Sequence, residues 1–171
     1  HILSDEGSAF YLGMQTMRLA AEDLDERTKC PYLTRRFMEK SGLDTLEKID
    51  LFVNEHLFDK SEIARFSMIA CEAAKQGDPQ AEGILKDCAE KIWKLIEDTA
   101  RKAGWTRQSQ ESLANGMEKP HLWLWGSVLV KNEIIRDEVV KRVRQVMPEI
   151  AVAVPETSAL DLALMLAGKI R

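Results

Sequence analysis

The sequence predicts a helix-rich α/β domain, and three observations support this prediction. Two apolar runs, 121–125 and 149–154, have the length and the flanking turn residues of buried β-strands. Each run is followed by a segment with helical periodicity, which favours a parallel strand pair with a right-handed crossover. The rest of the chain consists mainly of helical patterns separated by glycine, proline and capping residues. Because two strands alone make a poor sheet, we expect strands upstream of residue 1 to complete it.

Helical periodicity and capping residues locate the predicted helices. In chain order they cover residues 5–25, 32–41, 44–56, 60–76, 79–103, 133–146 and 158–169. Asp59-Lys60-Ser61-Glu62 has the pattern of a capping box, and Asp78-Pro79 combines a capping side chain with proline at the first helical position. Ser4-Asp5-Glu6 supplies the acidic and hydroxyl groups that favour the start of the first helix. Gly7 fits either a close backbone approach or a tolerated glycine in the first turn, and the second interpretation is favoured.

Composition limits the class of protein. The 171 residues form a single predicted domain with 24 basic and 28 acidic side chains, a net charge of −4 that gives no basic footprint for nucleic acid or a membrane surface. No apolar run reaches the roughly 18 residues that a membrane span requires. Cys30, Cys71 and Cys88 are odd in number and have no CxxC spacing, and the histidines are scattered. We therefore expect reduced thiols in a cytoplasmic protein, without a disulfide framework or a metal site.

A tight turn follows the first predicted strand. Gly126-Ser127 ends the run 121–125 and precedes the helical segment 133–146, which gives the order strand, turn, helix. Backbone N–H groups at such a turn point into the crevice at the carboxyl end of the strand, where phosphate or nucleotide usually binds in α/β proteins. An ordinary strand-to-helix connection without a ligand explains this stretch equally well.

Four short motifs resemble those of a known family. Ser4-Asp5-Glu6-Gly7-Ser8 and the residues up to Gly13 resemble a signature of the N-acetylglucosamine kinases and the wider BadF/BadG/BcrA/BcrD ATPase family. Three further motifs follow in that family's order: Gln76-Gly77-Asp78-Pro79, Gly126-Ser127-Val128 and Ser158-Ala159-Leu160. The resemblance spans nearly the whole chain. It implies that residues 1–171 are the C-terminal lobe of a two-lobed sugar kinase with the actin/hexokinase-like, or ribonuclease H-like, ATPase fold.

The resemblance also implies roles for individual residues. Asp5 matches the family aspartate that hydrogen-bonds the bound amino sugar, and the backbone near Ala9 would line the same pocket. Four residues match positions around the nucleotide: Ala64, Gly126, Ser127 and Lys131. The implied reaction transfers the γ-phosphoryl group of ATP to a sugar hydroxyl, with Mg²⁺ bound mainly by the N-terminal lobe.

Some family features do not occur in this sequence. The phosphate-binding Asp-Gly-Gly-Gly-Thr loop and the catalytic aspartate belong to the N-terminal portion of the family, so the expected partner is an N-terminal lobe of the same protein. Two alternatives remain beside the kinase: an activator ATPase of the BadF type, and a non-catalytic binding or scaffold module of the same fold. The first requires paired cysteines for an iron–sulfur cluster. The second is favoured by Trp125 and Asp161, which replace small family residues. A homodimer is also left open.

Overall fold

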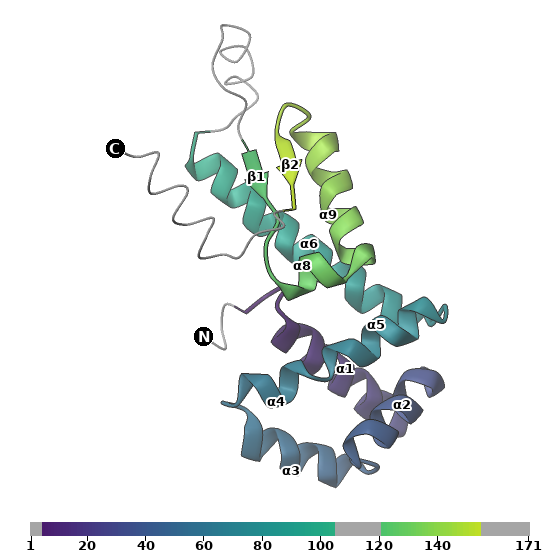
Figure 1. The fold of residues 1–171 in the computed structure, drawn as a ribbon. Helices are drawn as coiled ribbons and strands as arrows, with labels where there is room; N and C mark the ends of the chain where they lie inside the picture. The colour runs from purple at the N-terminus through teal and green to yellow at the C-terminus, as the bar shows by residue number, and fades with distance from the viewer. Residues whose placement is uncertain (1–4, 105–120, 155–171) are drawn as a thin grey trace, which may run out of the picture. The chain divides into compact units, whose positions relative to one another are not determined.

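The computed structural model describes residues 5–104 and 121–154, which are coloured in Figure 1. The chain divides into two compact units, His1–Ile92 and Trp93–Arg171. The predicted helix 158–169 lies outside the described residues. Within the described residues the chain is rich in helix and carries a two-stranded parallel sheet.

The helices and strands follow the sequence prediction closely in most places. The first unit contains α1 (Ala9–Leu24), α2 (Pro31–Ser41), α3 (Leu46–His56), α4 (Lys60–Ala64), α5 (Ser67–Lys75) and the larger part of α6 (Pro79–Lys102). The second contains the end of α6, β1 (His121–Trp123), α8 (Ser127–Lys131), α9 (Glu133–Val146) and β2 (Ala151–Ala153). The predictions at 32–41, 44–56, 79–103 and 133–146 are confirmed to within two residues.

The first helix begins later than the sequence predicts. Ser8 is its N-cap, and the Ser8 hydroxyl accepts a hydrogen bond from the backbone N–H of Tyr11 at 3.1 Å. Asp5 lies in a turn before the helix, where its carbonyl oxygen accepts a hydrogen bond from the Ser8 N–H at 3.1 Å. The prediction of a helix starting at residue 5 was therefore wrong, because residues 5–8 form a turn that packs through Gly7 against α6 and the helix begins after the Ser8 cap.

Gly7 belongs to the same turn and packs closely against α6. Its φ is +81°, and a Cβ built on it would lie 2.5 Å from Cγ1 of Ile92. Both the left-handed conformation and the close contact require glycine. The interpretation of Gly7 as a tolerated glycine in the first helical turn was wrong, since a close approach explains it.

The helix predicted at 60–76 is two helices, α4 and α5, with a break at Arg65 and Phe66. The N–H of Phe66 bonds the carbonyl of Ile63 at 3.1 Å, and the N–H of Ile69 bonds the carbonyl of Phe66 at 3.0 Å. These i→i−3 bonds tighten the chain locally. The break places the Phe66 ring, 2% exposed, edge-on against Phe37 with centroids 5.1 Å apart. Tertiary packing of this ring, rather than a local breaker, accounts for the difference.

The core of the first unit forms around α1, which packs against α2, α4 and α5 (Figure 1). The buried side chains include Leu12, Met17, Leu33, Phe37, Ile63, Ile69 and Leu85. Gly13 in the middle of α1 sets how closely α4 can approach. A Cβ on Gly13 would lie 2.0 Å from the carbonyl oxygen of Ile63. The close contact at Gly13 was not predictable, because a glycine within a helical pattern carries no sign of its tertiary neighbour.

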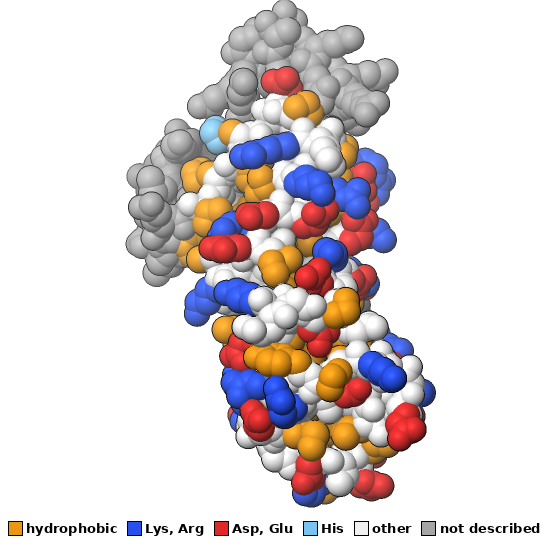
Figure 2. All heavy atoms as spheres, turned by 90° about the vertical axis from the view of Figure 1, so that its right-hand side faces the viewer, with side chains coloured by type: hydrophobic (Ala, Val, Ile, Leu, Met, Phe, Trp, Pro, Cys, Tyr) orange, Lys and Arg blue, Asp and Glu red, His pale blue; other side chains and the backbone are white. Residues whose placement is uncertain are grey.

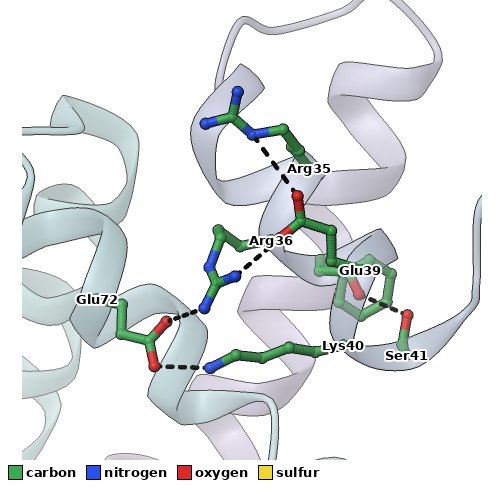
Figure 3. Close-up of polar contacts among 7 residues, drawn as sticks. Arg35, Arg36, Glu39, Lys40, Ser41 and Glu72 are labelled. Carbon is green, nitrogen blue, oxygen red and sulfur yellow. Dashed lines mark hydrogen bonds and ion pairs between the residues drawn. The ribbon is translucent and has the colours of Figure 1, made fainter.

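An ion-pair network joins α2 to α5 (Figure 3). Glu72 of α5 accepts from Arg36 at 3.3 Å and from Lys40 at 2.6 Å, and Arg36 also pairs with Glu39 at 2.8 Å. The hydrogen bond from Lys40 is the main cause that lowers the pKa of Glu72, and Arg36 adds to it. On the face shown in Figure 2, acidic and basic side chains are interspersed rather than gathered into a field of one sign.

Replacing Glu72 by glutamine should lower the free energy of unfolding by less than about 1 kcal/mol at neutral pH, because the pairs are partly exposed. The pKa of Glu72 is lowered in the folded state. Its contribution is therefore fully present above the unfolded value of about 4.3 and is lost as the pH falls through the lower folded pKa. Urea unfolding of wild type and E72Q across pH measures this. The difference in free energy of unfolding between wild type and E72Q should vanish in strong acid.

The matched control for E72Q is Glu55→Gln. Glu55 is exposed and makes no ion pair within the described residues. E55Q should therefore show no such pH-dependent difference from wild type. A destabilisation of E72Q that stays constant down to strong acid would contradict the assigned role of the network.

The sheet of the second unit confirms the predicted parallel pairing. The register joins His121 to Ala151, Leu122 to Val152 and Trp123 to Ala153. Both strands are shorter than predicted, and His121 and Trp123 are exposed, so the expectation of a strand buried on both faces was wrong within the described residues. The physical reason is that β1 pairs only with β2 among the described strands, which leaves part of its surface uncovered.

Candidate functional site

The turn before α1 presents the Asp5 carboxylate. Oδ2 of Asp5 forms an ion pair with Nζ of Lys60, the first residue of α4. Oδ1 makes no hydrogen bond within the part of the chain that the structure describes. The Asp5 side chain is 26% exposed, so the carboxylate is partly accessible to solvent. This arrangement orients a charged acceptor and leaves one oxygen for a ligand hydroxyl.

Lys60 is held in place by two neighbours besides Asp5. Asp59 caps α4 by accepting the N–H of Glu62 at 3.4 Å, which confirms the cap predicted at 59–62. The Lys60 ammonium lies 5.8 Å from the centroid of the Phe10 ring, a distance at which a cation and a ring attract. The sequence located Lys60 as a helix position only. Its pairing with Asp5 was missed because 55 residues separate the two.

Side chains of α6 hold the same turn and the start of α1. Lys91 pairs with Glu6 at 3.7 Å, and the Tyr11 hydroxyl donates a hydrogen bond to the Asp87 carboxylate. Burial, followed by the hydrogen bond to Asp87, raises the pKa of Tyr11. Tyr11 therefore remains a neutral donor. The turn that carries Asp5 is thus fixed by α4 and by α6.

The other two residues assigned to the first unit lie on the same helices. Ala9 is the first residue of α1, directly after the Ser8 cap, and is half-buried. Ala64 is the last residue of α4, and its Cα would lie 3.3 Å from a Cβ on Gly13. A small side chain at Ala64 is therefore explained by the contact of α1 with α4, whatever else it touches.

Gly126, Ser127 and Lys131 belong to the second unit. Gly126 has φ +103° and ψ 154°, a conformation essentially restricted to glycine. It precedes α8, where Ser127 is the first residue and Lys131 the last, and both are exposed. The predicted tight turn after the strand is confirmed, but it leads into the short helix α8 rather than directly into α9. Asn132 then caps α9 by accepting the Ile135 N–H at 3.0 Å.

No disulfide joins Cys30, Cys71 and Cys88. Cys30 and Cys88 are fully buried, and burial is the main cause that raises their thiol pKa values, to about 11 and about 12. The Cys88 thiol donates to the carbonyl of Gly7 at 3.5 Å. Both thiols are therefore neutral packing groups, which disfavours a cluster-binding role for them.

No group of three metal-ligating side chains occurs within residues 5–104 and 121–154. In that same part of the chain, no helix is both long and apolar enough to cross a membrane.

Sequence similarity links the chain to the sugar kinases. Over 97 residues it is 25% identical to a protein named N-acetylmuramic acid/N-acetylglucosamine kinase from Clostridium acetobutylicum. The match covers 57% of this chain and 32% of that relative, so the chain spans about a third of the relative it matches. No protein-family model matches the chain. This similarity supports the general class of sugar kinase that the sequence motifs indicate.

Proposed function

We propose that this chain is the C-terminal lobe of an ATP-dependent amino-sugar kinase of the N-acetylglucosamine kinase type, with the actin/hexokinase-like fold. The observation that carries the proposal is the oriented Asp5 carboxylate, in a chain that is 25% identical over 97 residues to an amino-sugar kinase. The complete protein would transfer the γ-phosphoryl group of ATP to a sugar hydroxyl in the cytoplasm. An N-terminal lobe of the same protein would complete the site, and a homodimer is compatible with this proposal.

On the sugar side, Asp5 is the binding group. An ionised carboxylate with one oxygen engaged by Lys60 and the other available accepts a hydroxyl hydrogen bond more strongly than a neutral acceptor does. Ala9 would line the same pocket through its backbone.

On the nucleotide side, we assign the turn at Gly126 and Ser127. No side chain caps the first turn of α8, so its N–H groups are available to phosphate oxygens or to the adenosine. Because α8 has only five residues, its dipole is small and the individual N–H groups would do most of the binding. Lys131 adds a positive charge at the far end of α8. The assignment of Ala64 to the nucleotide comes from the family resemblance alone.

Phosphoryl transfer also needs a metal ion, a phosphate-binding loop and a general base. Such reactions depend on positioning and charge neutralisation, with Mg²⁺ bridging the phosphates. In the family that the motifs resemble, the metal, the phosphate loop and the general base belong to the N-terminal lobe, and we assign them there. The role of this chain is to hold the sugar and the adenosine.

The proposal is tested by ADP release with N-acetylglucosamine and with N-acetylmuramic acid. The full-length protein should turn over at least one of these sugars. The 171-residue chain alone should show none above a no-protein control, because the phosphate loop and the general base lie elsewhere. Turnover by the 171 residues alone would contradict the assignment of those groups to another lobe.

A non-catalytic sugar-binding module is the second candidate. Trp125 is 37% exposed and directly precedes Gly126, so a large side chain stands beside the turn assigned to the nucleotide. Calorimetry with the full-length protein separates the two candidates. A module would bind sugar without binding ATP, whereas a kinase would bind both.

A further inference from the structure

We infer that Lys60 is a positioning residue of the sugar site, which holds the Asp5 carboxylate so that its second oxygen faces the sugar. This inference rests on the proposed function and adds to it a residue that the family resemblance does not assign. It is drawn from the contacts of Lys60, since no sequence motif marks this lysine as functional.

The geometry fixes the direction of the Asp5 side chain. Lys60 Nζ binds Oδ2 of Asp5, and Oδ1 has no hydrogen-bond partner among the described residues. The turn below is held separately, through the Ser8 N–H and through the pair of Glu6 with Lys91. The backbone of Asp5 is thus fixed by other contacts. The distinct contribution of Lys60 is the rotamer of the carboxylate.

The position of Lys60 argues against a role in helix stability. It is the first residue of α4, whose N-cap is the neighbouring Asp59 and not Lys60. The adjacent cap Asp59 satisfies the N–H of Glu62 without help from Lys60. Lys60 and Asp5 are 36% and 26% exposed, so the pair adds little to folding. A cation at this position is explained better by the carboxylate that it orients.

Phe10 limits the movement of the ammonium group. The Lys60 ammonium lies 5.8 Å from the ring centroid, and Phe10 itself is 8% exposed in the core. A lysine side chain has considerable rotamer freedom, and contact with a fixed ring reduces it. Because Phe10 restrains Lys60, Lys60 in turn favours one orientation of the Asp5 carboxylate.

The test compares Lys60→Met and Lys60→Arg in the full-length protein. We expect K60M to raise the dissociation constant for the sugar about three- to tenfold. This is the range for loss of one partly exposed charged contact. The ATP dissociation constant should be unchanged. K60R retains a cation and should restore sugar affinity to within about twofold of wild type, because arginine also binds carboxylates. Lys48→Met is the matched control. Nζ of Lys48, in α3, forms a surface ion pair with Oδ1 of Asp44, just before that helix, at 2.6 Å. K48M should leave both affinities unchanged.

A double-mutant cycle with Asp5→Ala distinguishes positioning from direct contact. If Lys60 acts through Asp5, adding K60M to D5A should change sugar affinity by less than about twofold. An equal loss in both backgrounds would mean that Lys60 touches the sugar itself, which overturns a positioning role. Unchanged sugar affinity in K60M, with weakened affinity in D5A, also overturns it and leaves the proposed function intact. Unchanged affinity in D5A would instead remove the proposed sugar site.

Discussion

Replacing Gly13 by alanine should destabilise the first unit by about 3 kcal/mol, at the upper end of the range for an overpacked core. The added Cβ would lie 2.0 Å from the carbonyl oxygen of Ile63 and 2.8 Å from its carbonyl carbon. Both atoms are backbone, so no side-chain rotation relieves the contact, and α1 and α4 must move apart. The helix propensity of alanine, about 1 kcal/mol better than glycine, offsets only part of this cost. Thermal unfolding measures the effect, with an expected fall of about 6–12 °C in Tm.

Gly83→Ala is the matched control for G13A. Gly83 also lies inside a helix, α6, but an added Cβ there meets nothing within 4 Å. The same substitution should therefore raise stability, by up to about 1 kcal/mol, through helix propensity alone. The two variants should shift Tm in opposite directions. A G13A protein as stable as wild type would show that α1 and α4 do not approach as closely as described.

Replacing Asp5 by alanine should weaken sugar binding by the full-length protein about 10- to 150-fold, the effect of losing a hydrogen bond of 1.5–3 kcal/mol to a charged acceptor. ATP affinity should remain close to that of wild type, because Asp5 is assigned to the sugar alone. The partner Lys60 is 36% exposed and stays solvated, so the loss of stability should be small. Calorimetric titration with sugar and with ATP, together with Tm, measures the three quantities.

Ser8→Ala provides the comparison for a purely structural change in the same turn. Ser8, not Asp5, caps α1, so S8A should cost about 1 kcal/mol of stability without a specific loss of sugar affinity. D5A should show the reverse pattern. A lowered Tm for D5A with unchanged sugar affinity would make Asp5 a structural residue and remove the site assignment.

Local signals in the sequence were sufficient for most helix ends. Asp78, predicted as a cap, accepts the backbone N–H groups of Gln80 and Ala81 at 3.0 and 3.1 Å, so the pattern that marks it is contained in a few adjacent residues. Gly42 ends α2 with φ +74°, as a glycine after the last periodic residue predicts. The parallel pairing of β1 with β2 was also predictable, because a helix joins the two apolar runs.

The candidate site was predictable only in part. The family motif marked Asp5 from adjacent residues alone, and the glycine-only conformation of Gly126 agrees with the turn predicted there. The roles of both residues remain predictions. The pairing of Lys60 with Asp5 was not predictable, because 55 residues separate the two and a single sequence does not record which distant residues meet.

The tertiary structure decided the features that depend on contacts between distant segments. The start of α1 depends on the turn at Gly7, which packs against Ile92, and the break between α4 and α5 depends on the burial of Phe66. The close approach of α1 to α4 depends on Gly13 meeting Ile63. Propensity and periodicity act over a few residues, whereas a packed core forbids overlap between any two atoms. The sequence therefore determined the order and type of the elements. Packing determined where α1 starts, where the predicted helix 60–76 divides into α4 and α5, and which cation faces Asp5.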